Sequence, residues 1–114
     1  ILGFNALKGN FLRDEINQFV KRNNNWSLQK EYHFGGYAKY NQELIRFINR
    51  FKKDTAIQLD PIYTGKMMFG IFDLLNNNKF QDGSKILAIH TGGIQGIEGF
   101  NKNLVRRKEP ILVL

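Results

Sequence analysis

The chain has 114 residues, of which 42% are hydrophobic and 24% are charged, a composition typical of one globular domain with a modest core. No apolar run approaches the roughly 18 to 20 residues of a membrane-spanning helix, and the first residues lack the basic start and cleavage site of a signal peptide. The absence of cysteine excludes a disulfide framework and a thiolate metal site. We therefore expect a cytoplasmic protein with no membrane partner and no bound metal.

The formal net charge of +7 raises the question of a polyanionic partner such as a nucleic acid. The cations are spread over short clusters, at Lys21 and Arg22, at residues 50–53 and at residues 106–108. These clusters lie at expected helix ends or in the tail, where a cation favours the negative end of a helix dipole. Solvated faces therefore explain the charge better than a nucleic-acid site does.

The first third of the chain predicts a strand, a helix and an extended segment. Residues 1–7 read ILGFNAL, an apolar run typical of a buried strand. Apolar residues then recur at helical spacing over residues 11–20, which predicts a helix. Residues 23–25 form a polar break, and residues 26–34 alternate well enough to predict an extended segment before the glycine-containing bend of residues 35–40.

Two further helices and another strand are predicted downstream. The helical period returns over residues 41–51, where Asn41 is placed to cap the first turn. Pro61 separates this helix from one over residues 67–75, which is apolar nearly all round and should be buried. Residues 84–93, SKILAIHTGG, read as a compact strand that ends in two glycines. This alternation predicts an α/β fold with a mostly parallel sheet flanked by helices.

Two polar segments are expected at one edge of this sheet, because ligands of parallel sheets bind beyond the carboxyl ends of the strands. They are residues 60–65 and residues 90–93, the second reading His-Thr-Gly-Gly. Gly65 followed by Lys66 suggests a phosphate-binding loop, but that loop needs an earlier glycine where Asp60 stands. We expect the Lys66 side chain to be solvated or ion-paired instead.

Three segments together resemble one enzyme family. They are YHFGGYAKY at residues 32–40, LDPIYTGKMMFGIFDLL at residues 59–75 and GSKILAIHTGGIQGIEGF at residues 83–100. In order and approximate spacing they resemble the carboxyl-terminal part of the 1-aminocyclopropane-1-carboxylate deaminase and D-cysteine desulfhydrase family. The resemblance covers nearly the whole chain and weakens after about Asn101. It implies a pyridoxal-phosphate enzyme with the fold of the tryptophan synthase β subunit, of which this chain would form part of the large domain.

The resemblance also implies roles for five residues. Tyr63 would lie beside the cofactor ring and the substrate, and Thr64 at the pyridine nitrogen. Tyr37 would face the substrate, while Thr91 and Gly92 would line the cofactor pocket. Family members act on small amino acids, release ammonia and a 2-oxo acid, and form homodimers. Tyr63 and Tyr37 are then the candidate catalytic residues, first for positioning the substrate and second for transferring protons.

A hydroxyl at the position of Thr64 bears on the choice of substrate, because a protein tunes pyridoxal phosphate through whatever contacts its ring nitrogen. A carboxylate would hold that nitrogen protonated. A neutral hydroxyl can donate to an unprotonated nitrogen, which makes a milder electron sink, suited to elimination of a good leaving group. The cyclopropane-opening family members carry glutamate at this place, so Thr64 favours the desulfhydrase-like branch.

The family's cofactor-binding lysine, its substrate-carboxylate loop and its phosphate-cradling loop all lie upstream of the matched region. The chain also opens on Ile1, inside an apolar run, rather than on methionine. We therefore expect residues 1–114 to be a single α/β segment from the carboxyl-terminal part of a longer enzyme, and to turn over no substrate alone.

Plainer interpretations stand beside these. Tyr63 and Thr64 can be an aromatic anchor and a helix cap, and His90 can be a histidine satisfied by hydrogen bonds rather than a base or metal ligand. The chain can be a non-catalytic basic binding module, or a truncated family member without activity. The tail NKNLVRRKEPILVL, residues 101–114, fits the last interpretation because it does not continue the family pattern.

Overall fold

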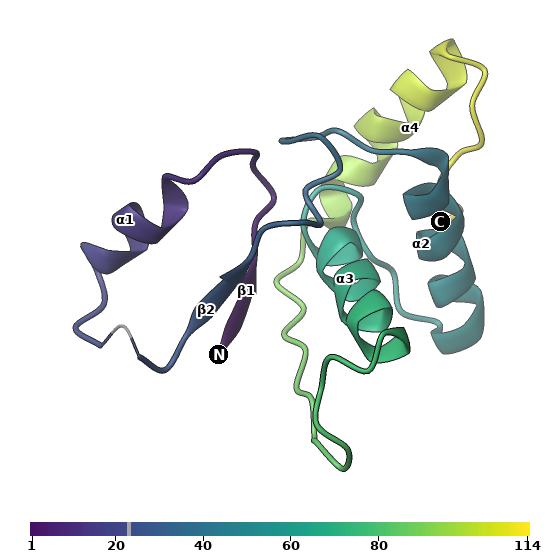
Figure 1. The fold of residues 1–114 in the computed structure, drawn as a ribbon. Coiled ribbons are helices and arrows are strands. Elements are labelled where there is room, and N and C mark those ends of the chain that lie inside the picture. The colour runs from purple at the N-terminus through teal and green to yellow at the C-terminus, as the bar shows by residue number, and fades with distance from the viewer. Residues whose placement is uncertain (23) are drawn as a thin grey trace.

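The computed structural model describes residues 1–22 and 24–114, and a small sheet lies between its helices (Figure 1). Strand β1, Leu2–Phe4, pairs in parallel with β2, Ser27–Gln29. Parallel strands need a crossover connection, and helix α1, Leu12–Asn17, lies in it. The predicted α/β class, with a parallel sheet flanked by helices, is confirmed.

Two longer helices, α2 and α3, pack together, and α3 lies on the side of the sheet away from α1 (Figure 1). Helix α2 spans Gln42–Thr55, and Asn41 Oδ1 accepts a hydrogen bond from the Leu44 N–H at 2.9 Å, which confirms the predicted cap. Helix α3 spans Thr64–Asn76. It approaches β1 closely at Gly70, where a Cβ would lie 2.5 Å from the Phe4 ring.

The core forms where α2 meets the segments that follow it. Three side chains of α2 are fully buried there, and the Phe69 ring of α3 lies edge-on to both Phe34 and Phe47. The start of α3, which carries Tyr63 and Thr64, therefore rests on α2. The buried apolar cluster comprises Leu44, Ile45, Ile48, Leu59, Ile97, Leu104 and Leu112.

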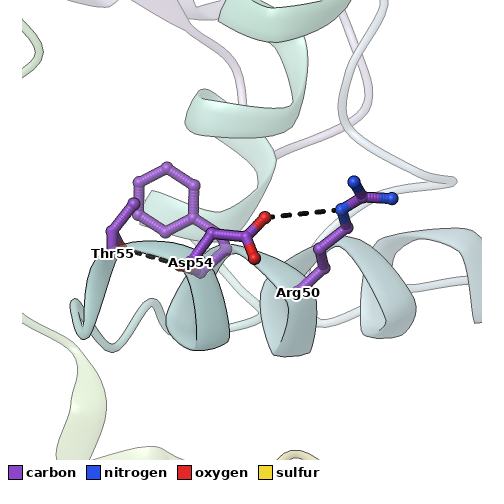
Figure 2. Close-up of polar contacts among 4 residues, drawn as sticks. Arg50, Asp54 and Thr55 are labelled. Carbon is purple, nitrogen blue, oxygen red and sulfur yellow. Dashed lines mark hydrogen bonds and ion pairs between the residues drawn. The ribbon is translucent and has the colours of Figure 1, made fainter.

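Helix α2 ends in a set of local polar contacts (Figure 2). The Thr55 hydroxyl donates to the Phe51 carbonyl at 2.7 Å, and Arg50 Nε lies 3.4 Å from Asp54 Oδ2. Both charged side chains are exposed, so their ion pair contributes little to stability. Ala56 takes a left-handed conformation, with φ of 62°, and stops the helix. The end lies a few residues beyond the last apolar residue of the predicted pattern.

The tail folds back onto the core. A 3₁₀ turn, η1 at Ile94–Gly96, leads into helix α4, Ile97–Arg106, which the sequence interpretation missed. Beyond α4, Leu112 is buried, and its N–H and C=O each bond the Asn101 side-chain amide at 2.9 Å. The Asn49 side chain of α2 bonds the backbone on either side of Leu112 in the same manner. The tail is thus an integral part of this core, which the truncated-member interpretation did not anticipate.

The predicted strand over residues 84–93 is wrong. No backbone–backbone hydrogen bond joins residues 85–90 to another described residue, and Leu87 and Ile89 are 87% and 66% exposed. The alternation of residue types suits a strand, but a strand also needs a hydrogen-bonded neighbour, and the described part of the chain brings none alongside.

Two helices also differ from expectation. Helix α1 ends at Asn17 rather than Val20, since it has no buried residue to hold a longer helix in place. Helix α3 is not buried all round, because Phe72 and Leu75 are 43% and 44% exposed. The predicted polar break at residues 23–25 includes Asn23, which lies outside the described residues.

Candidate functional site

Asp60 organises the start of α3. Its side chain is buried, and Oδ2 accepts hydrogen bonds from the N–H groups of Ile62 and Tyr63 at 2.7 and 2.8 Å. Oδ1 accepts from the N–H and the hydroxyl of Thr64 at 2.8 and 2.7 Å. The first N–H groups of a helix have no partner within the helix, so this carboxylate supplies one. The plainer interpretation expected Thr64 to cap this helix. The residue that caps α3 is instead Asp60.

The Thr64 hydroxyl is largely committed to Asp60. A hydroxyl has one proton to donate and two lone pairs that accept. The proton goes to Asp60 Oδ1 at 2.7 Å, and one lone pair accepts from the Asp60 N–H at 3.1 Å. While Asp60 is a carboxylate, Thr64 can thus accept one more hydrogen bond but can donate none. This reverses the donor role that the sequence suggested.

A cavity of about 360 Å³ lies at the carboxyl end of β1, beside the start of α3. This volume is within the range of small-molecule sites. Gly93 lets the two predicted segments meet here, because a Cβ on it would lie 2.9 Å from Asp60 Cγ. Of the predicted residues, three line the cavity and Tyr37 and Gly92 do not. The lining residues are Leu2, Gly3, Phe4, Asn5, Ala6, Tyr63, Thr64, Lys66, Met67, Ile89 and Thr91.

Tyr37 and Tyr63 form an aromatic pair at the rim of this cavity. Their ring centroids are 6.3 Å apart, and the two side chains are 55% and 48% exposed. Hydrogen bonding with Tyr37 raises the pKa of Tyr63, and the negative charge of Asp60 acts in the same direction. Tyr63 therefore keeps its proton near neutral pH, where it can donate a hydrogen bond but is a poor base.

Lys66 is buried, which contradicts the expectation of a solvated or ion-paired side chain. It is 1% exposed, and its ammonium group donates to the carbonyls of His33 and Gly36 at 2.8 and 2.9 Å. Gly35 and Gly36 have positive φ, so a tight turn can aim these carbonyls at the ammonium group. Lys66 thus ties this turn to α3 as well as lining the cavity.

Burial of Lys66 makes the stability of the chain depend on pH. Burial lowers the pKa of Lys66 to about 8, although the charge of Asp60 partly opposes this. An unfolded lysine has a pKa of about 10.4. Between the folded and the unfolded pKa, the unfolded chain still holds a proton that the folded chain has lost. The free energy of unfolding therefore rises with pH over this range. We expect the free energy of unfolding, measured by urea denaturation, to rise by about 2 kcal/mol between about pH 7.5 and pH 9.5.

The control for this pH dependence is Lys66→Met, which keeps a long buried side chain without its charge and should flatten the profile. At pH values above this range a second group affects the stability, because hydrogen bonding to Asp73 raises the pKa of Tyr32 to about 12. The folded chain then keeps a proton that the unfolded chain loses, so stability falls again at high pH. A flat profile in the wild-type chain would mean that Lys66 is solvated.

Asn5 lines the same cavity, and the sequence interpretation missed it. It directly follows β1, and its N–H still bonds the Gln29 carbonyl at 3.1 Å. The residue is 3% exposed, and neither Oδ1 nor Nδ2 has a hydrogen-bond partner among the described residues. The available signal was an amide side chain inside an otherwise apolar run, ILGFNAL.

His90 is satisfied by hydrogen bonds, as the plainer interpretation predicted. Its Nε2 lies 2.8 Å from the Gln58 carbonyl, and its Nδ1 accepts from the Gly92 N–H at 3.0 Å, so the ring proton is on Nε2. Within residues 1–22 and 24–114, no group of three or more His, Cys, Asp or Glu side chains could hold a metal ion. None of the helices described has the length and apolar character needed to cross a membrane.

Comparison with known proteins finds relatives of one kind. A protein of Pyrococcus horikoshii named as a candidate 1-aminocyclopropane-1-carboxylate deaminase is 40% identical over 75 residues, which are 66% of the chain and 22% of that protein. A D-cysteine desulfhydrase of Klebsiella pneumoniae is 33% identical over 78 residues, 68% of the chain and 24% of that protein. A bifunctional D-cysteine desulfhydrase/1-aminocyclopropane-1-carboxylate deaminase of Arabidopsis thaliana is 38% identical over 63 residues, 54% of the chain and 16% of that protein. No family model matches the chain.

These relatives are enzymes named for the removal of ammonia or sulfide from small amino acids. The predicted resemblance to the 1-aminocyclopropane-1-carboxylate deaminase and D-cysteine desulfhydrase family is confirmed. It extends over 54% to 68% of the chain in these three matches, less than the nearly complete coverage expected. The chain spans about a fifth of the length of the curated relatives it matches.

Proposed function

We propose that the chain is the carboxyl-terminal part of a pyridoxal-phosphate enzyme that releases ammonia and a 2-oxo acid from a small amino acid. The observation that carries the proposal is the meeting of Tyr63, Thr64 and Thr91 around one cavity at the carboxyl end of β1. The names of the relatives support both a deaminase and a desulfhydrase activity. The sequence argument from Thr64 for the desulfhydrase-like branch needed a hydroxyl that donates, whereas this hydroxyl accepts, so the choice of D-cysteine as substrate rests on the names of the relatives.

The residues around the cavity fit a small heteroaromatic cofactor. Thr64 offers a lone pair, Thr91 a hydroxyl and Asn5 an unpartnered amide, while Met67 and Ile89 supply apolar surface. A flat ring with polar edges needs this mixture of apolar walls and a few polar groups. When bound, pyridoxal phosphate supplies the electron sink for chemistry at the α-carbon of the amino acid.

Each predicted residue then has a task that its surroundings allow. Thr64 would accept a hydrogen bond at the ring nitrogen, and Asp60 holds the hydroxyl in the orientation for it. Thr91 would border the ring, and the open space beside Gly92 would let the backbone come close to a ligand. Tyr63 and Tyr37 position the substrate from the rim, and Tyr63 donates a hydrogen bond rather than removing a proton.

A groove beside β1 supports the proposal that β1 and β2 are part of a larger sheet in the full-length enzyme. Apolar side chains of β1 and of residues 84–89 face each other across a cavity of about 550 Å³. Residues 85–90 make no backbone–backbone hydrogen bond to any described residue, so a further strand from the rest of the enzyme fits there. The cofactor-binding lysine belongs to that remaining part. The chain alone is therefore expected to be inactive, and the full-length enzyme to be a homodimer.

Replacing Thr64 in the full-length enzyme tests this function. Thr64→Val keeps the shape and removes the hydroxyl, so the yellow absorbance of bound cofactor should persist while kcat with D-cysteine falls about tenfold or more. Thr64→Ser keeps the hydroxyl and should retain most of the turnover. Equal turnover in the valine variant and the wild type would remove Thr64 from the mechanism, whereas a wild-type enzyme that binds no cofactor would refute the function itself.

A further inference from the structure

Asn5 is a buried polar side chain of the cavity that has no hydrogen-bond partner among the described residues. It is 3% exposed, and both Oδ1 and Nδ2 lack hydrogen bonds to the residues that the structure describes. Native proteins rarely bury an amide in this way, because each missing hydrogen bond costs free energy that water would otherwise recover. A buried amide without a protein partner therefore marks a place where something else binds.

The position of Asn5 points to a ligand of the cavity. The hydrogen bond from its N–H to Gln29 fixes its backbone at the carboxyl end of β1, the edge at which parallel sheets bind ligands. Two polar neighbours around the cavity are already engaged, Thr64 with Asp60 and Lys66 with the turn at residues 33–36. Neither can turn towards Asn5 without losing bonds of its own.

The amide also supplies hydrogen-bond donors, which the Thr64 hydroxyl does not. Thr64 can accept a hydrogen bond but cannot donate one while Asp60 is a carboxylate. Asn5 has two N–H donors on Nδ2 and an acceptor on Oδ1, all free of described partners. A ligand with polar groups at more than one edge, as pyridoxal phosphate has, needs donors as well as acceptors.

We infer that Asn5 binds the cofactor of the proposed enzyme directly, giving it an amide donor and a carbonyl acceptor. The inference rests on the proposed function, because the cofactor is the ligand that function implies. Asn5 is then a binding residue distinct from the five that the sequence pattern singles out. The missing partner of its side chain is then the cofactor.

The test measures pyridoxal-phosphate binding and cofactor-free melting temperature in full-length wild-type enzyme and in the Asn5→Leu variant. Leucine has nearly the shape of asparagine without its polar atoms. The cofactor dissociation constant should rise about tenfold or more, because the hydrogen bonds to the cofactor are lost. The melting temperature of the cofactor-free enzyme should stay level or rise, because an unpaired amide has left the interior.

Asn101→Leu is the matched control, since the Asn101 amide is fully engaged with the Leu112 backbone. It should lower the cofactor-free melting temperature and leave the cofactor dissociation constant unchanged. An unchanged dissociation constant in Asn5→Leu would overturn the inference. So would a drop in its cofactor-free melting temperature like that of the control, which would give Asn5 a partner within the protein.

Two further outcomes are separable. If Asn5→Leu does not fold, Asn5→Ala replaces it, with the same expected loss of cofactor affinity and the same consequence if affinity is unchanged. A wild-type enzyme that binds no pyridoxal phosphate overturns the proposed function and this inference together. That failure is seen before any variant is made, so it cannot be confused with a failure confined to Asn5.

Discussion

Asp60→Ala is expected to lower the free energy of unfolding of the chain by about 4 kcal/mol, because it leaves several hydrogen-bond donors without their acceptor at once. The N–H groups of Ile62, Tyr63 and Thr64 and the Thr64 hydroxyl all lose their acceptor. Each donor left unpaired in a buried site costs about 1 to 3 kcal/mol, and water reaching the more exposed ones reduces the sum. Urea denaturation followed by far-ultraviolet circular dichroism measures the loss.

Asp54→Ala is the control for this experiment, because it also removes an aspartate beside a helix end. Among the described residues its carboxylate pairs with Arg50 alone (Figure 2). The Asp54 side chain is 57% exposed, so the expected change is below about 1 kcal/mol. Asp60→Asn should fall between the two, since an amide oxygen still accepts while the amide nitrogen faces other donors. A loss at Asp60 no larger than that at Asp54 would show that α3 does not depend on this carboxylate.

Gly65→Ala is expected to cost about 3 kcal/mol, although alanine is ordinarily the better helix former. A Cβ at Gly65 would lie 2.5 Å from the Asp60 carbonyl oxygen and 2.6 Å from Ile48 Cδ1. The carbonyl is backbone that also accepts the Gly65 N–H at 2.8 Å, and Ile48 is fully buried, so neither has room to yield. The start of α3 must shift, and the melting temperature and unfolding free energy should both fall.

Gly99→Ala is expected to have the opposite effect on the stability of the chain. Gly99 lies in α4 with nothing within 4 Å of the position of a Cβ, so the substitution should stabilise the chain by up to about 1 kcal/mol. The difference between the two glycine variants isolates the effect of close packing from that of helix propensity. Equal effects of the two substitutions would contradict the packing at Gly65 described above.

The parts of the fold that depend on near neighbours in sequence were predictable. Apolar residues at helical spacing and a capping asparagine placed α2 correctly, because both signals act within one or two turns. The spacing of Ile97, Asn101 and Leu104 carries a similar signal for α4, supported by the exposed pair of Glu98 and Lys102. The glycines at residues 96 and 99 obscured it, since glycine ordinarily argues against a helix interior.

The parts that depend on distant partners were not predictable. The strand expected at residues 84–93 has the right residue types, but a strand exists only beside another strand. Lys66 resembles a surface lysine by its place in the sequence, yet its partners are the carbonyls of a turn some thirty residues earlier. The unpaired amide of Asn5 likewise follows from its three-dimensional surroundings. The Thr64 hydroxyl is different, because its partner Asp60 lies only four residues earlier and the sequence interpretation missed this local contact.

The two bonds from Lys66 to the glycine turn have a mechanical consequence. They clamp the loop that carries Tyr37 to the helix that begins at Thr64, so both sides of the rim shift together if either shifts. A bulkier ligand of the cavity cannot gain room by an outward movement of the loop unless the buried ammonium group loses its bonds to both carbonyls. A wider entrance to the cavity would therefore come from replacing Tyr37 or Tyr63 with a smaller residue, while the backbone around them stays in place.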